Sequence, residues 1–269
     1  MRRALAAGAL ALLVATVTTA AERPLVAAVR GGAALWPENS LLAFRNALAL
    51  GVDVLEFDLH LTRDGEVVVM HDATLDRTTT ASGPVRDRTL EELRTVRLKS
   101  RDGQVTAEPV PTFAEVLDLA RPSAVELLPE IKAGAGNRPY PGIEEKVLAL
   151  VRARGLLSRV TIQAFDPETI RRLRALQPGV RTMYLASRRR IEAERMTPVE
   201  VVGRARELGA TDLGMEFRVV DQDVVAAARA AKIRLSVWTV NDEPDMRRMI
   251  ALGVDVIMSD RPDVVRGLR

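Results

Sequence analysis

The chain has 269 residues, no cysteine, and 39 basic against 36 acidic side chains, so its formal net charge is only +3. The lack of cysteine excludes a disulfide framework and a thiolate metal site. Aromatic residues make up 3% of the chain, and no basic run has aromatics between its charges, which argues against a nucleic-acid-binding protein. The short run Arg188-Arg189-Arg190 fits a solvated loop or the start of a helix.

Residues 1–21 have the pattern of a secretory signal peptide. Arg2 and Arg3 precede an apolar stretch from Ala4 to Val17, and small residues continue to Ala21. An uncleaved membrane anchor is the alternative interpretation. No other stretch approaches the roughly 18 apolar residues that a membrane span needs. We therefore expect a periplasmic or secreted protein with no stable membrane span after signal cleavage.

From residue 25 onward, short apolar runs of strand type alternate with stretches of helical periodicity. The expected strands are 25–29, a segment from 56, 126–132, 160–165, 180–185, 212–217, 235–240 and 254–259. The expected helices are 40–50, 112–120, 143–155, 167–176, 198–208, 221–231, 243–252 and a short one from Pro262. Asn39 or Ser40 can cap the first helix, and Gly51 ends it.

Eight strands, each followed by a helix, predict a (βα)₈ TIM barrel over residues 25–269. A small insertion of approximately residues 62–110 follows strand two and contains a short helix near 90–96. The competing fold is a doubly wound open sheet. That fold would need a glycine-rich phosphate loop after strand one, and Arg30-Gly31-Gly32 lacks the required spacing.

The second strand carries an unusual polar pattern. Glu56, Asp58 and His60 lie two residues apart, so in a strand their side chains share one face. An Asp-Gly turn at residues 64–65 and the run Val67-Val68-Val69 predict a hairpin that returns His71 toward them. The acidic face suits a hard cation such as Ca²⁺ or Mg²⁺. A solvated strand face is the alternative.

Further charged residues stand at the ends of other strands, where the active site of a barrel lies. Glu130 joins Glu56 and Asp58 as a candidate cation ligand, while Arg30 and Lys132 are available for an anion. A divalent cation beside fixed positive charge is suited to phosphoryl chemistry. Two other acidic residues at strand ends, Asp166 and Asp260, are expected to be helix caps.

The sequence resembles the glycerophosphodiester phosphodiesterases across essentially the whole mature chain. The segments that carry the resemblance, in order and with family spacing, are Arg30-Gly31-Gly32, Pro37-Glu38-Asn39-Ser40, Glu56-Phe57-Asp58, Thr62-Arg63-Asp64-Gly65, His71-Asp72, Arg77-Thr78-Thr79, Glu130-Ile131-Lys132, Trp238-Thr239-Val240-Asn241 and Gly253 followed by Asp260-Arg261-Pro262.

The resemblance implies a TIM barrel with an insertion after strand two, and three ligands for Ca²⁺ or Mg²⁺: Glu56, Asp58 and Glu130. It implies that Arg30 binds the phosphate as a catalytic and substrate-binding residue, with Lys132 beside the same group. Trp238 is a further substrate-binding candidate, and His71 is one of two acid/base histidines. The implied reaction is metal-dependent hydrolysis of a small-molecule glycerophosphodiester to sn-glycerol 3-phosphate and an alcohol.

The chain departs from the family pattern at Val29, because the family motif has a histidine at this position, and that histidine is the partner of His71. Valine neither accepts nor donates a proton, so either water or the metal shares the two proton-transfer roles with His71, or the activity falls by roughly 10²- to 10⁴-fold. His60 is an auxiliary candidate for the missing role. The alternatives are a catalytically silent relative that binds phosphodiesters or headgroups, and a lipid-directed lyase on the same barrel.

Overall fold

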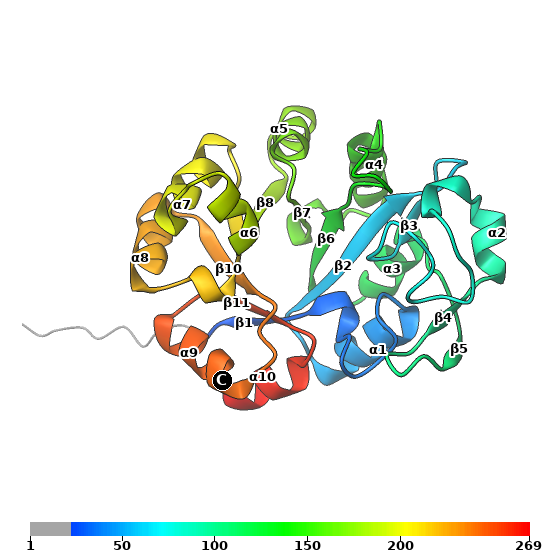
Figure 1. The fold of residues 1–269 in the computed structure, drawn as a ribbon, viewed down its shortest axis with the longest axis horizontal. Helices are drawn as coiled ribbons and strands as arrows, with labels where there is room; N and C mark the ends of the chain where they lie inside the picture. Colours follow the sequence, from blue (N-terminus) through cyan, green and yellow to red (C-terminus); the bar gives the residue numbers. More distant parts are fainter. Residues whose placement is uncertain (1–22) are drawn as a thin grey trace, which may run out of the picture.

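The computed structural model describes residues 23–269, and it shows a ring of parallel strands surrounded by helices (Figure 1). The barrel strands are β1 (Leu25–Ala28), β2 (Val54–Leu61), β6 (Glu126–Ile131), β7 (Thr161–Ala164), β8 (Arg181–Ala186), β9 (Asp212–Glu216), β10 (Arg234–Trp238) and β11 (Val256–Ser259). Because β1 pairs with both β11 and β2, the sheet is closed. The predicted (βα)₈ barrel is confirmed. The expected signal peptide lies outside the described residues.

The helices of the barrel follow the predicted order. They are α1 (Leu41–Leu50), α3 (Phe113–Ala120), α4 (Ile143–Ala153), α5 (Pro167–Leu176), α7 (Pro198–Glu207), α8 (Gln222–Ala231), α9 (Glu243–Leu252) and α10 (Pro262–Leu268). A further helix, α6 (Arg188–Ala193), begins at the run of three arginines. Asp166 caps α5 as predicted, since its side chain accepts from two backbone N–H groups. The cap predicted for Asp260 is wrong, because its carboxylate accepts from Asn241 Nδ2 at 2.8 Å.

The insertion between β2 and α3 lies beside the barrel near α1 and α3 (Figure 1). Its elements are β3 (Val67–Val69), α2 (Leu90–Thr95), β4 (Arg97–Lys99) and β5 (Val105–Pro109). The strand β3 pairs antiparallel with β2, which confirms the predicted hairpin. The short helix is confirmed as well. The β4–β5 pair was missed, because both strands are short and no residue of β5 is fully buried.

The polar face of β2 is not a solvated face, because all eight residues of this strand are buried. Phe57 and Leu59 belong to the apolar layer between strands and helices, where Phe57 meets Phe44 and Phe113 at centroid distances of 5.5 and 5.8 Å. Side chains alternate across a strand, so Glu56 and Asp58 point to the opposite face, which in a barrel is the interior. Successive side chains of β2 therefore lie on two buried surfaces, the apolar layer under the helices and the barrel interior.

The first strand ends one residue earlier than expected. Val29 already belongs to a 3₁₀ turn over Val29–Gly31, and its carbonyl oxygen accepts from Gly32 N–H at 2.8 Å. Gly31 has φ of 80°, and a Cβ there would lie 2.8 Å from Cβ of Ala43. Glycine is therefore required for the chain to turn this close to α1.

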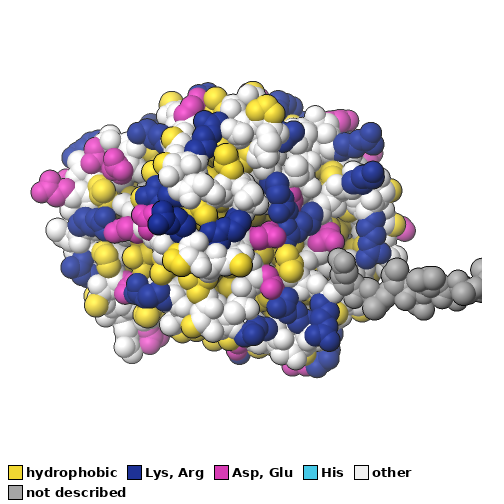
Figure 2. Space-filling model, turned by 180° about the vertical axis from the view of Figure 1, so that it is seen from behind, with side chains coloured by type: hydrophobic (Ala, Val, Ile, Leu, Met, Phe, Trp, Pro, Cys, Tyr) yellow, Lys and Arg dark blue, Asp and Glu magenta, His cyan; other side chains and the backbone are white. Residues whose placement is uncertain are grey.

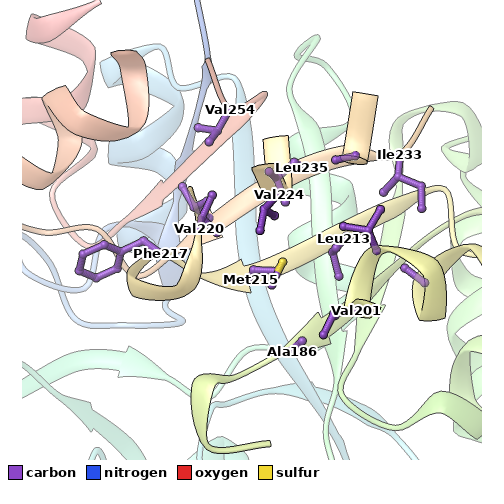
Figure 3. Close-up of a cluster of buried hydrophobic side chains, with 14 of the residues drawn as sticks. Ala186, Val201, Leu213, Met215, Phe217, Val220, Val224, Ile233, Leu235 and Val254 are labelled. Carbon is purple, nitrogen blue, oxygen red and sulfur yellow. The ribbon is translucent and has the colours of Figure 1, made fainter. Parts of the chain in front are cut away.

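Apolar layers fill the space between the strands and the outer helices. Figure 3 shows one of them, in which Leu213 and Met215 of β9 and Leu235 of β10 lie with Val201 of α7 and Val224 of α8. On the surface, Lys and Arg side chains are interspersed with Asp and Glu over the face in Figure 2. Between residues 23 and 269, none of the helices combines the length and apolar character that crossing a bilayer demands.

Candidate active site

Three buried carboxylates meet at the C-terminal ends of two neighbouring barrel strands. Glu56 and Asp58 are on β2, and the sheet register pairs Asp58 with Glu130 of β6. One ligand oxygen from each residue lies within 4.8 Å of the other two. The three residues are only 4%, 1% and 7% exposed. The structure thus brings together the three residues predicted as cation ligands.

Burial and mutual repulsion shift the pKa values of these groups. The pKa of Glu56 lies well above its ordinary value because the side chain is buried and faces the charges of Asp58 and Glu130. Burial also raises the pKa of Glu130, to about 7. For Asp58, burial is outweighed by nearby positive charge, first that of Lys132, so its pKa is lowered. Added positive charge in this space would therefore favour the ionised forms of Glu56 and Glu130.

The neighbouring amide groups fit a hard divalent cation. Gln163 Nε2 donates to Glu56 Oε1 at 2.9 Å, and Asn39 Nδ2 donates to Asp58 Oδ2 at 2.9 Å. The amide oxygens of Gln163 and Asn39 are buried and have no hydrogen-bond partner among the described residues. Because Ca²⁺ and Mg²⁺ take carboxylate and amide oxygens as ligands, this donor set suits such an ion.

Arg30 and Lys132 adjoin the carboxylates, as predicted. Lys132 Nζ lies 2.9 Å from Glu130 Oε1 and 3.4 Å from Asp58 Oδ1. Arg30 Nε lies 3.6 Å from Asp58 Oδ2, and its backbone N–H donates to Glu56 Oε2 at 2.9 Å. Arg30 has φ of 51°, which is unusual for a residue other than glycine. Its backbone is held there because its carbonyl oxygen also accepts from Asn39 N–H at 2.9 Å.

His71 is oriented by a chain of charged groups. Its Nδ1 lies 2.7 Å from Asp72 Oδ1. Arg77 donates to both Asp72 and Glu38, and Glu38 also accepts from Arg30 at 3.1 Å. The hydrogen bond from Arg77 holds the pKa of Asp72 below its usual range, while burial lowers the pKa of His71. With Nδ1 engaged by a carboxylate, Nε2 is the ring nitrogen left to exchange a proton.

His60 lies behind the site and not on its wall. The residue is fully buried, with Nδ1 2.9 Å from the Tyr140 hydroxyl and Nε2 3.2 Å from the carbonyl oxygen of His71. Burial lowers its pKa to about 4, so the ring is neutral near pH 7. Since both nitrogens have partners, the structure places His60 as a support for the backbone of His71.

These groups surround a cavity of about 140 Å³ at the mouth of the barrel. Its lining includes His71, Arg30, Lys132 and the three carboxylates. Phe165 and Trp238 form one wall, with their rings edge to face at 5.6 Å. Val29 is also on the wall and is 6% exposed. The residue that departs from the family pattern therefore lies in the same cavity as His71.

Sequence reasoning missed the roles of several residues around the site. Of the two predicted caps of α1, Ser40 is confirmed, whereas Asn39 donates to Asp58, a role that was not foreseen. The contact between Gln163 of β7 and Glu56 was also not foreseen. A polar side chain on an otherwise apolar strand, at the end where the acids lie, is the signal that could have found Gln163.

Comparisons with known proteins agree on one family. The profile of the glycerophosphoryl diester phosphodiesterase family matches residues 30–264. The chain is 34% identical to a glycerophosphodiester phosphodiesterase of Caldanaerobacter subterraneus subsp. tengcongensis, over 91% of this chain and 98% of the relative.

Solved structures show the same similarity. One from Agrobacterium tumefaciens, provisionally assigned as a glycerophosphoryl diester phosphodiesterase, has a TM-score of 0.84 and 27% identity over 91% of this chain and 97% of its own. A phosphodiesterase of Oleispira antarctica, solved with the product sn-glycerol-3-phosphate, has a TM-score of 0.74 and 25% identity over 91% and 96%.

Proposed function

Because the chain belongs to the glycerophosphoryl diester phosphodiesterase family, we propose that it hydrolyses glycerophosphodiesters to sn-glycerol 3-phosphate and an alcohol. One observation carries this proposal: three buried carboxylates share a single cavity with Arg30, Lys132 and His71. A phosphodiester needs positive charge against its oxygens and a group that can transfer protons. The cavity offers both.

The proposed metal ligands are Glu56, Asp58 and Glu130. A divalent cation bound there would supply positive charge against the phosphate oxygens. In its presence the carboxylates have a second counter-charge, so Lys132 is freer to meet a phosphate oxygen together with Arg30. His71, oriented by Asp72, is proposed to protonate the leaving oxygen or to accept a proton from the nucleophile. Trp238 would form the wall of the cavity on one side of the substrate.

Val29 favours a second candidate function. The wall at this position presents only methyl groups, so one of the two proton-transfer roles has no side chain there. The second candidate is a catalytically silent relative that binds phosphodiesters through the cation site and Arg30. Hydrolysis, lowered by roughly 10²- to 10⁴-fold, remains our first proposal because His71 and its carboxylate partner are in place.

The test is release of glycerol 3-phosphate from glycerophosphocholine by the mature protein. We expect turnover with added Ca²⁺ or Mg²⁺ and its loss with a chelator, since the phosphate would then face uncompensated carboxylates. Binding of glycerophosphocholine with no detectable product under any metal condition would instead establish the silent relative. The absence of both binding and turnover would contradict both candidates for this substrate.

Cation binding should strengthen as pH rises through about 7. Burial raises the pKa of Glu130 from 4.5 to about 7, so the folded protein holds more protons than the unfolded chain between these values. The metal-free protein therefore loses stability as pH rises through this window. A bound cation displaces the protons, so we expect a larger rise in Tm on adding Mg²⁺ or Ca²⁺ at about pH 8 than at about pH 6.

Scanning fluorimetry with metal or chelator at both pH values measures this difference. The variant Glu130→Gln should lose most of the metal-induced rise at both pH values. Its matched control, Glu91→Gln, changes an exposed carboxylate of α2 and should keep the full rise. A rise in Tm that is equal at the two pH values would argue against ionised Glu130 as a ligand.

We further propose that the protein is exported, on the basis of the signal-peptide pattern in residues 1–21. Amino-terminal sequencing of the protein recovered from cells that express the full chain would test this. A mature terminus close to Glu22 is expected, and an intact Met1 terminus would refute cleavage.

A further inference from the structure

A second cavity adjoins the catalytic one on the side of the insertion. It has a volume of about 340 Å³ and shares Arg30 and Thr239 with the catalytic cavity. Arg77, Lys99 and Arg101 of the insertion line its other side. Since the two cavities meet at Arg30, the proposed phosphate-binding residue, a phosphodiester held there can extend one of its two substituents into the second cavity.

Two bases of the second cavity form no ion pair with any described residue. Arg77 is fully engaged, because it donates to Glu38 at 2.9 and 2.8 Å and to Asp72 at 2.7 and 3.0 Å. The side chains of Lys99 and Arg101, in contrast, form no ion pair or hydrogen bond with any residue between 23 and 269. Their charges therefore remain available to a ligand.

Neither carboxylate on the same walls forms an ion pair with these two bases. Glu38 is bound to Arg77 and Arg30, and Asp260 accepts from Asn241 Nδ2 at 2.8 Å. An anion in the cavity would meet Lys99 and Arg101 without displacing an existing partner. Partly exposed cations without partners attract anions at short range, and arginine in addition presents a fork that matches phosphate geometry.

A third cavity shows that this charge is specific to the insertion side. It has a volume of about 550 Å³ and shares Glu130, Lys132 and Phe165 with the catalytic cavity. Its further walls carry the carboxylates of Glu144 and Asp166 and the guanidinium of Arg190, which already pairs with Glu194. Of the two neighbouring cavities, the second therefore offers an anionic substituent more unpaired positive charge.

We propose that the second cavity is a subsite for an anionic substituent, so that the favoured substrates are glycerophosphodiesters whose alcohol carries a further phosphate. This inference rests on the proposed function and specifies its substrate class. Lys99 ends β4 and Arg101 lies in the turn that joins β4 to β5. The small two-stranded sheet that sequence reasoning missed is thereby assigned the recognition of the substituent.

Two matched diesters test the subsite: glycerophosphoglycerol and bis(glycerophospho)glycerol, which adds a second phosphate to the same glycerol alcohol. We expect a higher kcat/KM for the second compound. The comparison is made per diester bond, because that compound has two equivalent ones. The double variant Lys99→Gln/Arg101→Gln should lower that value about tenfold and leave glycerophosphoglycerol within about twofold. High salt should shrink the difference between the substrates in the unmutated protein.

Arg206→Gln is the matched control, because it removes an exposed charge on α7, away from the insertion. Equal kcat/KM values per diester bond in the unmutated protein, or a preference that survives in the double variant, would overturn the inference. If neither diester is hydrolysed, the proposed function fails, and calorimetric titration with bis(glycerophospho)glycerol then decides. Weaker binding by the double variant than by Arg206→Gln supports the subsite, and equal or absent binding refutes it.

Discussion

Replacing Val29 with histidine is expected to raise the rate of glycerophosphodiester hydrolysis by about 10²- to 10⁴-fold, which is the contribution of one general acid or base. Val29 lies on the wall of the cavity that holds His71, and the valine side chain transfers no proton. Cleavage of a phosphodiester needs one group that accepts a proton and another that donates one. The substitution would supply the second group in an otherwise complete site. The measurement is kcat for release of glycerol 3-phosphate with saturating metal.

Two further variants separate proton transfer from changes of shape. Val29→Ala opens the same wall without a titratable group, and Val29→Gln adds polarity and length without one. Both should stay within a few-fold of the unmutated rate, and only Val29→His should add a new limb to the pH dependence of kcat. If Val29→His is no faster than Val29→Gln, this wall is not where the second proton is transferred.

The barrel could be predicted from the sequence because its signals are local. Each apolar strand run is followed by a helix, and caps such as Asp166 are read from a few adjacent residues. The meeting of the three proposed cation ligands was predictable for a related reason. Glu56 and Asp58 share a face by strand geometry, and Glu130 ends the strand that pairs with theirs. Parallel strands bring such ends to one edge of the barrel.

The contacts that tune the site could not be predicted, since they join residues far apart in the chain. Gln163 reaches Glu56 across 107 positions, and the sequence contains no pattern that pairs them. For His60, the face of the strand was predicted correctly and the position of the ring was not. Strand alternation placed its side chain correctly on the face of Asp58, but the hydroxyl of Tyr140, 80 residues away, holds the ring behind the cavity. Alternation specifies the face of a side chain and not the partners that it finds there.

Replacing His71 with alanine is expected to lower kcat by about 10²- to 10⁴-fold and to leave KM within a few-fold. The chain has two histidines, and both ring nitrogens of His60 are already engaged. His71 is therefore the imidazole on the cavity wall that can exchange a proton with substrate. Arg30 and the proposed cation ligands do not depend on it for substrate binding, so the loss should fall on the chemical step.

The same variant shows what His71 does when a second readout accompanies the rate. His71→Ala leaves the three carboxylates unchanged, so its metal-induced rise in Tm should match that of the unmutated protein. A fall in kcat with that rise preserved means that His71 acts in the chemistry and not in holding the fold or the cation. An unmutated rate in His71→Ala would move proton transfer away from this residue. The cavity would then hold no histidine in a catalytic role, and hydrolysis would rest on Arg30, the proposed cation and water.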